Sequence, residues 1–307
     1  MITNEPSPRE AWREKSVEFD WEAHRRFLQK AHFRPLFDRA FGRLLKNEMA
    51  GAFDFIPDLK EAFLAQFDSW VNGSTFNKIS GLEAFRHRDF IQGVTHSLDD
   101  LHITFGRRLV CLEKEYAYHR RMKADFVHRR LETLQAGDVL VIAVPFAWYG
   151  DLHPQNAEIL KRCLELGIPV HVDAAWYGCL RGFEFHYDHP AIQSVSFSLS
   201  KGLGLGSYRV GVRYSRERHP GPVTIINDFQ MEVTPVMACG LKFMREFGSD
   251  YLQSRYGAAY DHVCERLNLR PTKALHMAFG QVEGGEWWPL GVRPFLRYLV
   301  DDLNEFK

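Results

Sequence analysis

The amino-acid sequence predicts an α/β protein built on a mainly parallel, doubly wound sheet. Two near-continuous apolar runs, residues 138–145 and 169–173, have the composition of strands that are covered on both faces. Between them, residues 154–166 have the periodicity of an amphipathic helix, and Gly167, a residue that commonly ends helices, follows. Because buried strands that alternate with helices are typical of parallel sheets, this segment predicts the centre of the fold.

The alternation continues on both sides of this centre. We expect further strands at residues 108–113, 194–198 and 210–214, and helices at residues 96–105 and 124–134. The two ends of the chain are predicted to be mainly helical. Their expected elements are helices at 21–41 and 58–70, a long helical stretch from 229 to 267, a short strand at 274–279 and a final helix at 292–306.

Composition and charge narrow the class of protein. The 307 residues include 39 Lys and Arg against 39 Asp and Glu, so bulk charge gives no reason to expect a nucleic-acid partner. No apolar run approaches the roughly 18 residues of a membrane span, and residues 1–15 lack the apolar core of a signal peptide. The five cysteines are scattered without a C-x-x-C pair, which predicts reduced thiols in a cytoplasmic protein.

One lysine stands in an unusual local sequence. Lys201 follows the expected strand at 194–198, lies between Ser198, Ser200 and a glycine-rich loop, and precedes Arg209 by eight residues. The amine of a lysine in such a setting can be desolvated, which lowers its pKa and makes it nucleophilic. The segment therefore predicts a reactive lysine with a nearby cationic group.

Two further segments complete a candidate site. Asp173 ends a buried strand, where a carboxylate needs a partner. The partner can be a cation, such as a protonated pyridine nitrogen or an arginine, or the N–H groups of the next turn. Gly93, Val94 and Thr95 open the helix expected at 96–105, so their N–H groups, a hydroxyl and the positive end of the helix dipole can bind a phosphate.

Together these segments resemble the fold type I enzymes that depend on pyridoxal 5′-phosphate (PLP), and the aminotransferase class I/II family in particular. The segments Ser198-Leu199-Ser200-Lys201 and Arg209-Val210-Gly211, with Asp173 before them, match the family pattern over about residues 75–215. The resemblance implies that Lys201 forms a Schiff base with PLP and that Asp173 pairs with the ring nitrogen. It also implies that the cofactor phosphate is bound by Arg209, Ser198, Ser200, Gly93, Val94 and Thr95.

The resemblance suggests roles for several other side chains. An aromatic residue usually stacks on the cofactor ring, and Tyr116 is the first candidate for this role, before Tyr118. Arg293 and Arg297 are candidates for binding the substrate carboxylate, because a guanidinium fork suits that group. The same resemblance implies a homodimer and a small α+β domain formed by both termini.

The chain also departs from the family pattern. Residues 144–153 lack the N-P-x-G motif, whose Asn donates to the ring oxygen of the cofactor. The family tyrosine three residues after the aspartate is replaced by Trp176, with Tyr177 next to it. We hypothesise that Trp176, Tyr177 or Tyr149 contacts the ring oxygen instead, and we include Tyr177 among the substrate-binding candidates.

The resemblance implies an aminotransferase of amino acid metabolism that transfers an amino group, with a keto acid as the acceptor. It divides the chain into an N-terminal helical segment (1–74), a PLP-binding large domain (75–228) and a C-terminal small domain (229–307). A PLP-dependent lyase, decarboxylase or condensing enzyme stays open because of the missing motif, and so does a non-catalytic binding protein. A nucleotide-binding protein is disfavoured, because the spacing of glycines 202, 204 and 206 does not fit G-x-G-x-x-G.

Overall fold

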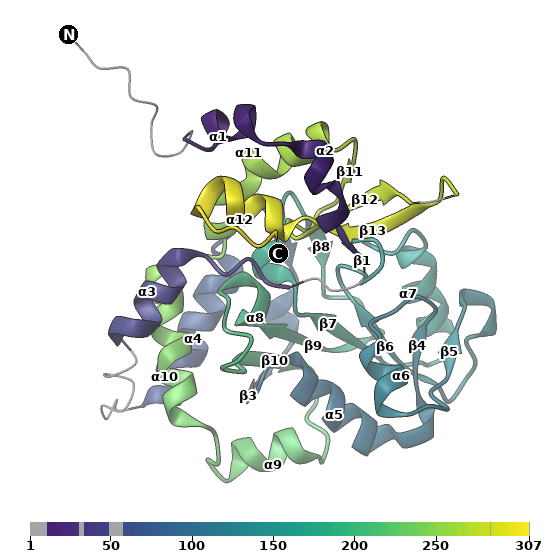
Figure 1. The fold of residues 1–307 in the computed structure, drawn as a ribbon. Helices are drawn as coiled ribbons and strands as arrows, with labels where there is room; N and C mark the ends of the chain where they lie inside the picture. Colours follow the sequence, from purple (N-terminus) through teal and green to yellow (C-terminus); the bar gives the residue numbers. More distant parts are fainter. Residues whose placement is uncertain (1–10, 31–33, 49–57, 283, 307) are drawn as a thin grey trace.

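The computed structural model describes residues 11–30, 34–48, 58–282 and 284–306. Its centre is a seven-stranded sheet with the strand order β3-β10-β9-β7-β6-β4-β5 (Figure 1). The five strands from β9 to β5 are parallel, whereas β10 runs antiparallel to both β9 and β3. The strand bounds are β3 His87–Ile91, β4 Leu109–Leu112, β5 His128–Arg129, β6 Val139–Ala143, β7 Val170–Ala174, β9 Ile192–Ser198 and β10 Gly211–Ser215.

Both faces of this sheet are covered, and this explains the near-continuous apolar strands. Alternate strand residues belong to two different apolar clusters. One cluster joins the strands to helix α5 and contains Leu109, Cys111, Val139 and Val141. The other is the main core and contains their neighbours Val110, Leu112, Leu140 and Ile142. Because each strand buries both faces, the doubly wound α/β class predicted from the sequence is confirmed.

Helices from distant parts of the chain supply the two coverings. Helix α5 packs on one face, beside α9, while α4, α7 and α10 contribute to the main core. The bounds are α4 Leu59–Asn72, α5 Val94–Phe105, α6 Tyr118–Met122, α7 Asn156–Glu165, α8 Leu199–Gly202, α9 Pro222–Asp228 and α10 Thr234–Glu246. Among helices in the described ranges, none has the length and apolar content to cross a membrane.

A second, antiparallel sheet brings the two ends of the chain together. Its strand order is β1-β13-β12-β11, so an N-terminal strand pairs with the C-terminal hairpin. Figure 1 shows the purple N-terminal and yellow C-terminal segments side by side above the large sheet. The bounds are α1 Trp12–Glu18, α2 Trp21–His24, β1 Gln29–Lys30, α3 Arg39–Glu48, α11 Tyr251–Arg266, β11 Arg270–Pro271, β12 Met277–Gln281, β13 Trp287–Gly291 and α12 Arg293–Asp301; a separate parallel pair joins β2 Lys78–Ser80 to β8 Glu184–His186.

Several sequence predictions of elements were wrong. The helix expected at 124–134 is replaced by β5 and a 3-10 turn, because residues 128–129 pair with the open edge of β4. The helix expected at 21–41 is broken into α2, a 3-10 turn, β1 and the start of α3, although residues 31–33 of this range lie outside the described residues. Pro35 disfavours a helical conformation of the residue before it, which agrees with this break.

Near the C-terminus the deviations are smaller. The helical stretch expected from 229 to 267 consists of α10 and α11. Residues 229–233 are not helical, and a break at residues 247–250 contains Gly248. The strand expected at 274–279 lies at 277–281, and the last helix ends at Asp301 instead of residue 306. Strands β3 and β13 were not predicted, because the first three residues of β3 are polar and Pro289 interrupts the apolar segment of β13.

Candidate active site

The predicted aspartate and lysine lie at the same edge of the large sheet. Asp173 is the fourth residue of β7 and pairs in register with Ser196 of the neighbouring strand β9. Strand β9 ends at Ser198, and the short helix α8 that follows contains Lys201. Since β7 and β9 are parallel, both side chains belong to the carboxyl edge, where ligands of open α/β sheets bind.

Burial shifts the pKa values of both groups toward their neutral forms. Burial raises the pKa of Asp173 to about 6, although the Ala175 N–H that it accepts at 2.9 Å and the charge of Lys201 act in the opposite direction. Burial likewise lowers the pKa of Lys201, and the positive charge of Arg293 adds to this effect. The site therefore holds an acid that a cationic partner would stabilise, beside an amine of increased nucleophilicity.

Arg209 lies against the start of helix α5. Its backbone is left-handed, with φ of 57°, and its guanidinium donates to the hydroxyl of Thr95. Gly93 has φ of 70°, and a Cβ atom at this position would lie only 2.8 Å from Nη2 of Arg209. Only glycine permits this approach of the guanidinium to the N-terminus of α5. The guanidinium and the N-terminus of α5 therefore lie together, an arrangement that suits an anion.

The two serines before the lysine are bonded to each other. Ser198 Oγ lies 2.6 Å from Ser200 Oγ and 3.2 Å from the carbonyl oxygen of Val210, and it accepts from the Ser200 N–H at 3.0 Å. Ser198 thus caps α8 and joins it to the loop that carries Arg209. Ser198 therefore helps to hold the turn that carries Lys201. Ser200 is less buried than Ser198.

Tyr116 follows β4 and is 44% exposed. Its ring stacks on that of Tyr118 at 5.8 Å between centroids, and Tyr118 in turn donates to the carboxylate of Asp99. Burial and the charge of Asp173 raise the pKa of Tyr116, whereas Arg209 lowers it, so the ring lies within electrostatic reach of both. This placement suits Tyr116, rather than the anchored Tyr118, for the stacking role.

The three candidates for the ring oxygen differ in their surroundings. The ring of Trp176 meets the ring of His276 edge to face at 4.5 Å. Tyr177 is only 1% exposed, and its hydroxyl donates to the carbonyl of Val71. Tyr149 packs against Phe146 and His153. Tyr177 is therefore a core residue, and its expected contacts with substrate or the ring oxygen are incompatible with this placement.

Three buried groups in this region escaped the sequence analysis. His276 and Cys179 are hydrogen-bonded at 3.2 Å between Nδ1 and Sγ, and the charge of Lys201 influences the pKa values of both. Glu115 accepts from the N–H groups of Ala143 at 2.9 Å and Tyr116 at 2.8 Å. Each is a lone residue in an ordinary apolar or charged segment, so no spacing could have identified it.

The two candidate carboxylate-binding arginines lie one turn apart on helix α12, with Arg293 as its first residue. Arg293 donates to Glu305 Oε1 at 2.7 Å, and Arg297 donates to the same oxygen. Burial lowers the pKa of Arg293, with Glu305 opposing this effect. Arg293 also influences the pKa of Lys201, so this guanidinium lies within electrostatic reach of the candidate lysine. The structure thus associates Arg293 with the site and places a carboxylate of the chain itself on it.

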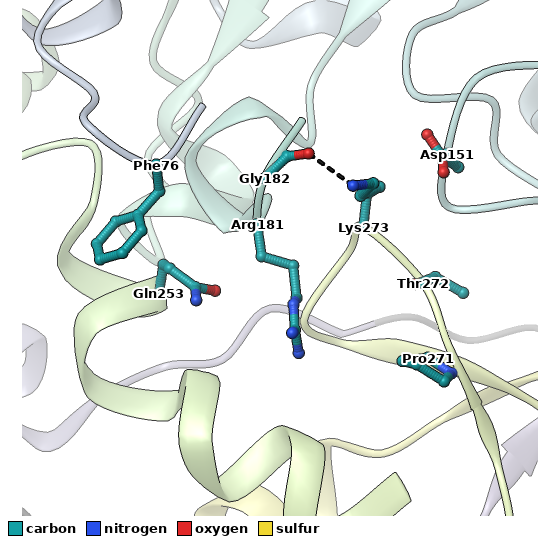
Figure 2. Close-up of a pocket in the computed structure, with 8 residues that line it drawn as sticks. All are labelled: Phe76, Asp151, Arg181, Gly182, Gln253, Pro271, Thr272 and Lys273. Carbon is teal, nitrogen blue, oxygen red and sulfur yellow. Dashed lines mark hydrogen bonds between the residues drawn. The ribbon is translucent and has the colours of Figure 1, made fainter. Parts of the chain in front are cut away.

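A pocket of about 410 Å³ is lined by none of the residues that the sequence predicted for the site. Figure 2 shows Arg181 and Lys273 among its lining residues, with Lys273 donating to the carbonyl of Gly182 at 2.7 Å. Arg181 forms an ion pair with Asp261. Both cations of this pocket thus have partners within the protein. In the described part of the chain, no cluster of side chains suits a metal ion.

Comparisons with solved structures show which fold these residues occupy. The chain resembles aspartate aminotransferase from Thermus thermophilus with maleate, at a TM-score of 0.59 and 14% identity, over 99% of this chain and 97% of that one. It resembles the PLP-bound C-S lyase from Staphylococcus hominis at a TM-score of 0.58 and 12% identity, over 86% and 87% of the two chains. Aromatic aminotransferase from Pyrococcus horikoshii OT3 gives 0.57 and 14%, over 88% and 92%.

Sequence comparison adds nothing to this assignment, because no family model and no curated protein sequence matches the chain. The likenesses in structure extend over most of the chain and of each of the compared structures. They establish that the chain has the fold of the fold type I PLP-dependent enzymes.

Proposed function

We propose that the chain binds PLP and is an aminotransferase that acts on an amino acid. The observation that carries this proposal is that Asp173 and Lys201 share the carboxyl edge of the sheet, Asp173 in strand β7 and Lys201 in the short helix α8 that directly follows the adjacent parallel strand β9. Arg209 at the start of α5 supports it as the third element of the site. A non-catalytic binding protein would need neither a buried acid nor a desolvated lysine beside it.

The described residues fit PLP in three respects. Asp173 is a partly buried carboxylate at the end of a buried strand, and a protonated pyridine nitrogen would supply the cation that stabilises it. Lys201 has a lowered pKa, as a lysine that attacks an aldehyde requires. Gly93, Thr95 and Arg209 form a region with a close backbone approach, a hydroxyl and a guanidinium, which suits a phosphate.

Bound PLP would supply the capacity to accept electrons from the carbon that carries the substrate amine. Asp173, held as a carboxylate, would keep the proton on the ring nitrogen. Lys201 Nζ would take a proton from the α-carbon of the amino acid, and burial favours this role because it lowers the pKa of the amine. Tyr116 would cover one face of the ring and limit the access of water.

A different PLP reaction is the second candidate function. The segment 144–153 offers no asparagine at the family position, and a C-S lyase is among the similar structures. The two readings are separated by incubating the protein with PLP and a panel of amino acids, with and without a keto acid. Turnover that requires the keto acid supports the aminotransferase, whereas turnover without it, with pyruvate, ammonia or carbon dioxide as products, supports a lyase or decarboxylase.

Replacing Trp176 with phenylalanine tests whether the indole N–H contacts the ring oxygen. We expect the pH midpoint of the absorption band of bound PLP to shift, because a hydrogen bond to that oxygen favours its charged form. The packing of the ring against His276 is largely kept in this variant. A spectrophotometric titration that superimposes on that of the wild type would remove Trp176 from this role.

Replacing Glu305 with glutamine is expected to improve the binding of carboxylate substrates. The carboxylate of Glu305 competes for the guanidinium of Arg293, and a charged hydrogen bond of this kind contributes about 1 kcal/mol when partly exposed. We therefore expect KM for the amino acid to fall about fivefold with little change in kcat. An unchanged KM in steady-state kinetics would show that Arg293 is not the carboxylate-binding residue.

The assembly that we propose is a homodimer, as the resemblance implies. Large apolar side chains are exposed along α9 and the connection to α10, namely Ile225, Phe229, Met231 and Val233. Such side chains are more common at interfaces between subunits than on the surface of monomers. Sedimentation equilibrium at twice the chain mass of 35.7 kDa would support the dimer, and a single chain mass would exclude it.

A further inference from the structure

A buried carboxyl group that the proposed reaction does not use lies between the ends of two central strands. Glu115 is 7% exposed and belongs to the turn after β4. The turn is tight, since Lys114 has a left-handed backbone with φ of 66° and the Glu115 N–H donates to the Leu112 carbonyl at 3.3 Å. The side chain of Glu115 is thereby directed from β4 toward the end of β6.

The two carboxyl oxygens of Glu115 bind two different backbone segments. Oε2 accepts from the N–H of Ala143, the last residue of β6, and Oε1 accepts from the N–H of Tyr116. Ala143 is the residue of β6 that pairs with Asp173 of β7. One side chain thus connects the strand beside Asp173 with the segment that carries Tyr116.

We propose that Glu115 is a positioning residue that fixes Tyr116 relative to Asp173, so that the tyrosine ring covers the face of the bound cofactor. The inference rests on the proposed PLP function. Tyr116 is half exposed, with its ring against Tyr118 on one side, so packing alone constrains it weakly. The Tyr118–Asp99 contact holds the far end of this aromatic pair, and Glu115 holds the near end.

The geometry explains why an acid occupies this buried position. Two N–H donors require two acceptor oxygens, whereas a glutamine side chain supplies one oxygen and presents an NH₂ group to the second donor. Burial and the charge of Asp173 raise the pKa of Glu115 to about 8, while the two N–H groups that it accepts from oppose this shift.

A double-mutant cycle tests whether Glu115 acts through Tyr116. The dissociation constant of PLP is measured for the wild type, Glu115→Gln, Tyr116→Ala and the double variant, together with the visible circular dichroism of the bound cofactor. We expect Glu115→Gln to weaken binding five- to tenfold and to reduce the dichroic band in the wild-type background. In the Tyr116→Ala background the same change should alter binding less than twofold, since nothing remains to be positioned.

Two controls separate positioning from general damage. Glu113→Gln removes a carboxylate from the same turn, where it is half exposed and pairs with Arg130, and should leave all readouts unchanged. Hydrogen exchange of the cofactor-free protein should show faster exchange at the Tyr116 and Ala143 amides in Glu115→Gln alone. If that variant does not fold, Glu115→Asp, which keeps two acceptor oxygens on a shorter side chain, takes its place in the cycle.

The outcomes also distinguish this inference from the function on which it rests. A wild-type protein that does not bind PLP overturns the proposed function and the inference with it. Wild-type binding combined with equal losses for Glu115→Gln in both backgrounds overturns the positioning role alone. The same conclusion follows if Glu115→Gln binds PLP as tightly as the wild type with an unaltered dichroic band.

Discussion

Replacing Asp173 with asparagine is expected to reduce kcat/KM with an amino acid by about two to four orders of magnitude. Asparagine keeps the shape of the side chain and can still accept from the Ala175 N–H. It removes the negative charge that would stabilise a protonated ring nitrogen in a buried site. Leaving one member of a buried ion pair without its partner costs about 3–5 kcal/mol, which corresponds to this loss.

The same substitution, which lowers activity, should raise the stability of the cofactor-free protein at neutral pH. Burial raises the pKa of Asp173 to about 6, above the unfolded value near 3.9, so the folded state binds the extra proton between these pH values. The wild type therefore loses stability as the pH rises from about 4 to about 6, and the loss persists above pH 6. Without this ionisation, Asp173→Asn should be more stable than the wild type at pH 7, by about 3 kcal/mol at most.

Urea unfolding of both proteins at pH 4 and pH 7 measures this difference. Asp261→Asn, which removes the exposed partner of Arg181, serves as a matched control and should retain full activity. If Asp173→Asn keeps wild-type kinetics, the carboxylate has no ring nitrogen to stabilise. If it is less stable than the wild type at pH 7, Asp173 is a structural residue whose loss damages the fold.

Replacing Arg209 with methionine is expected to weaken PLP binding by about 10- to 100-fold. A charge-assisted hydrogen bond contributes about 1.5–3 kcal/mol, and methionine retains much of the apolar stem of arginine. Binding of pyridoxal, which lacks the phosphate, should be almost unchanged, because the guanidinium lies at the start of α5, where we place the phosphate. Fluorescence titration of the apoprotein with both ligands measures the two dissociation constants.

A second substitution tests whether the close approach of Arg209 to Gly93 matters for the binding of PLP. Gly93→Ala would place a Cβ atom 2.8 Å from Nη2 of Arg209 and would strain a backbone with φ of 70°. It should weaken PLP binding in the wild-type background and less so in Arg209→Met, whose shorter side chain can give way. Equal losses of affinity for PLP and pyridoxal in Arg209→Met would contradict the assignment of this region to the phosphate.

The sequence predicted the central sheet and the core of the candidate site for a shared reason. Strands β6 and β7 are buried on both faces, and such strands have a continuous apolar composition that can be recognised without the structure. Asp173 and Lys201 stand where such strands end, so their order along the chain already implied a shared edge. The division at residues 74 and 228 stays a prediction, although β1 and the C-terminal hairpin share one sheet.

Other features depend on contacts between distant segments and have no local signal. Residues 128–129 form a strand only because the edge of β4 is open to them. The acid Glu115 meets Ala143 across 28 positions of sequence, and His276 meets Cys179 across 97. Tyr177 was misassigned because its place after Asp173 suggested access to a ligand, whereas a core position opposite Trp70 buries its ring. Tertiary packing decides each of these cases.

The measurement that tests the central claim most directly is the absorption spectrum of the wild type and Lys201→Ala after incubation with PLP. We expect a yellow band in the wild type that borohydride makes permanent, with mass spectrometry locating the reduced adduct on Lys201. Lys201→Ala should form no such adduct, although Asp173 and Arg209 should let it retain PLP weakly. A wild type that acquires no band, or an adduct on another lysine, would contradict the account.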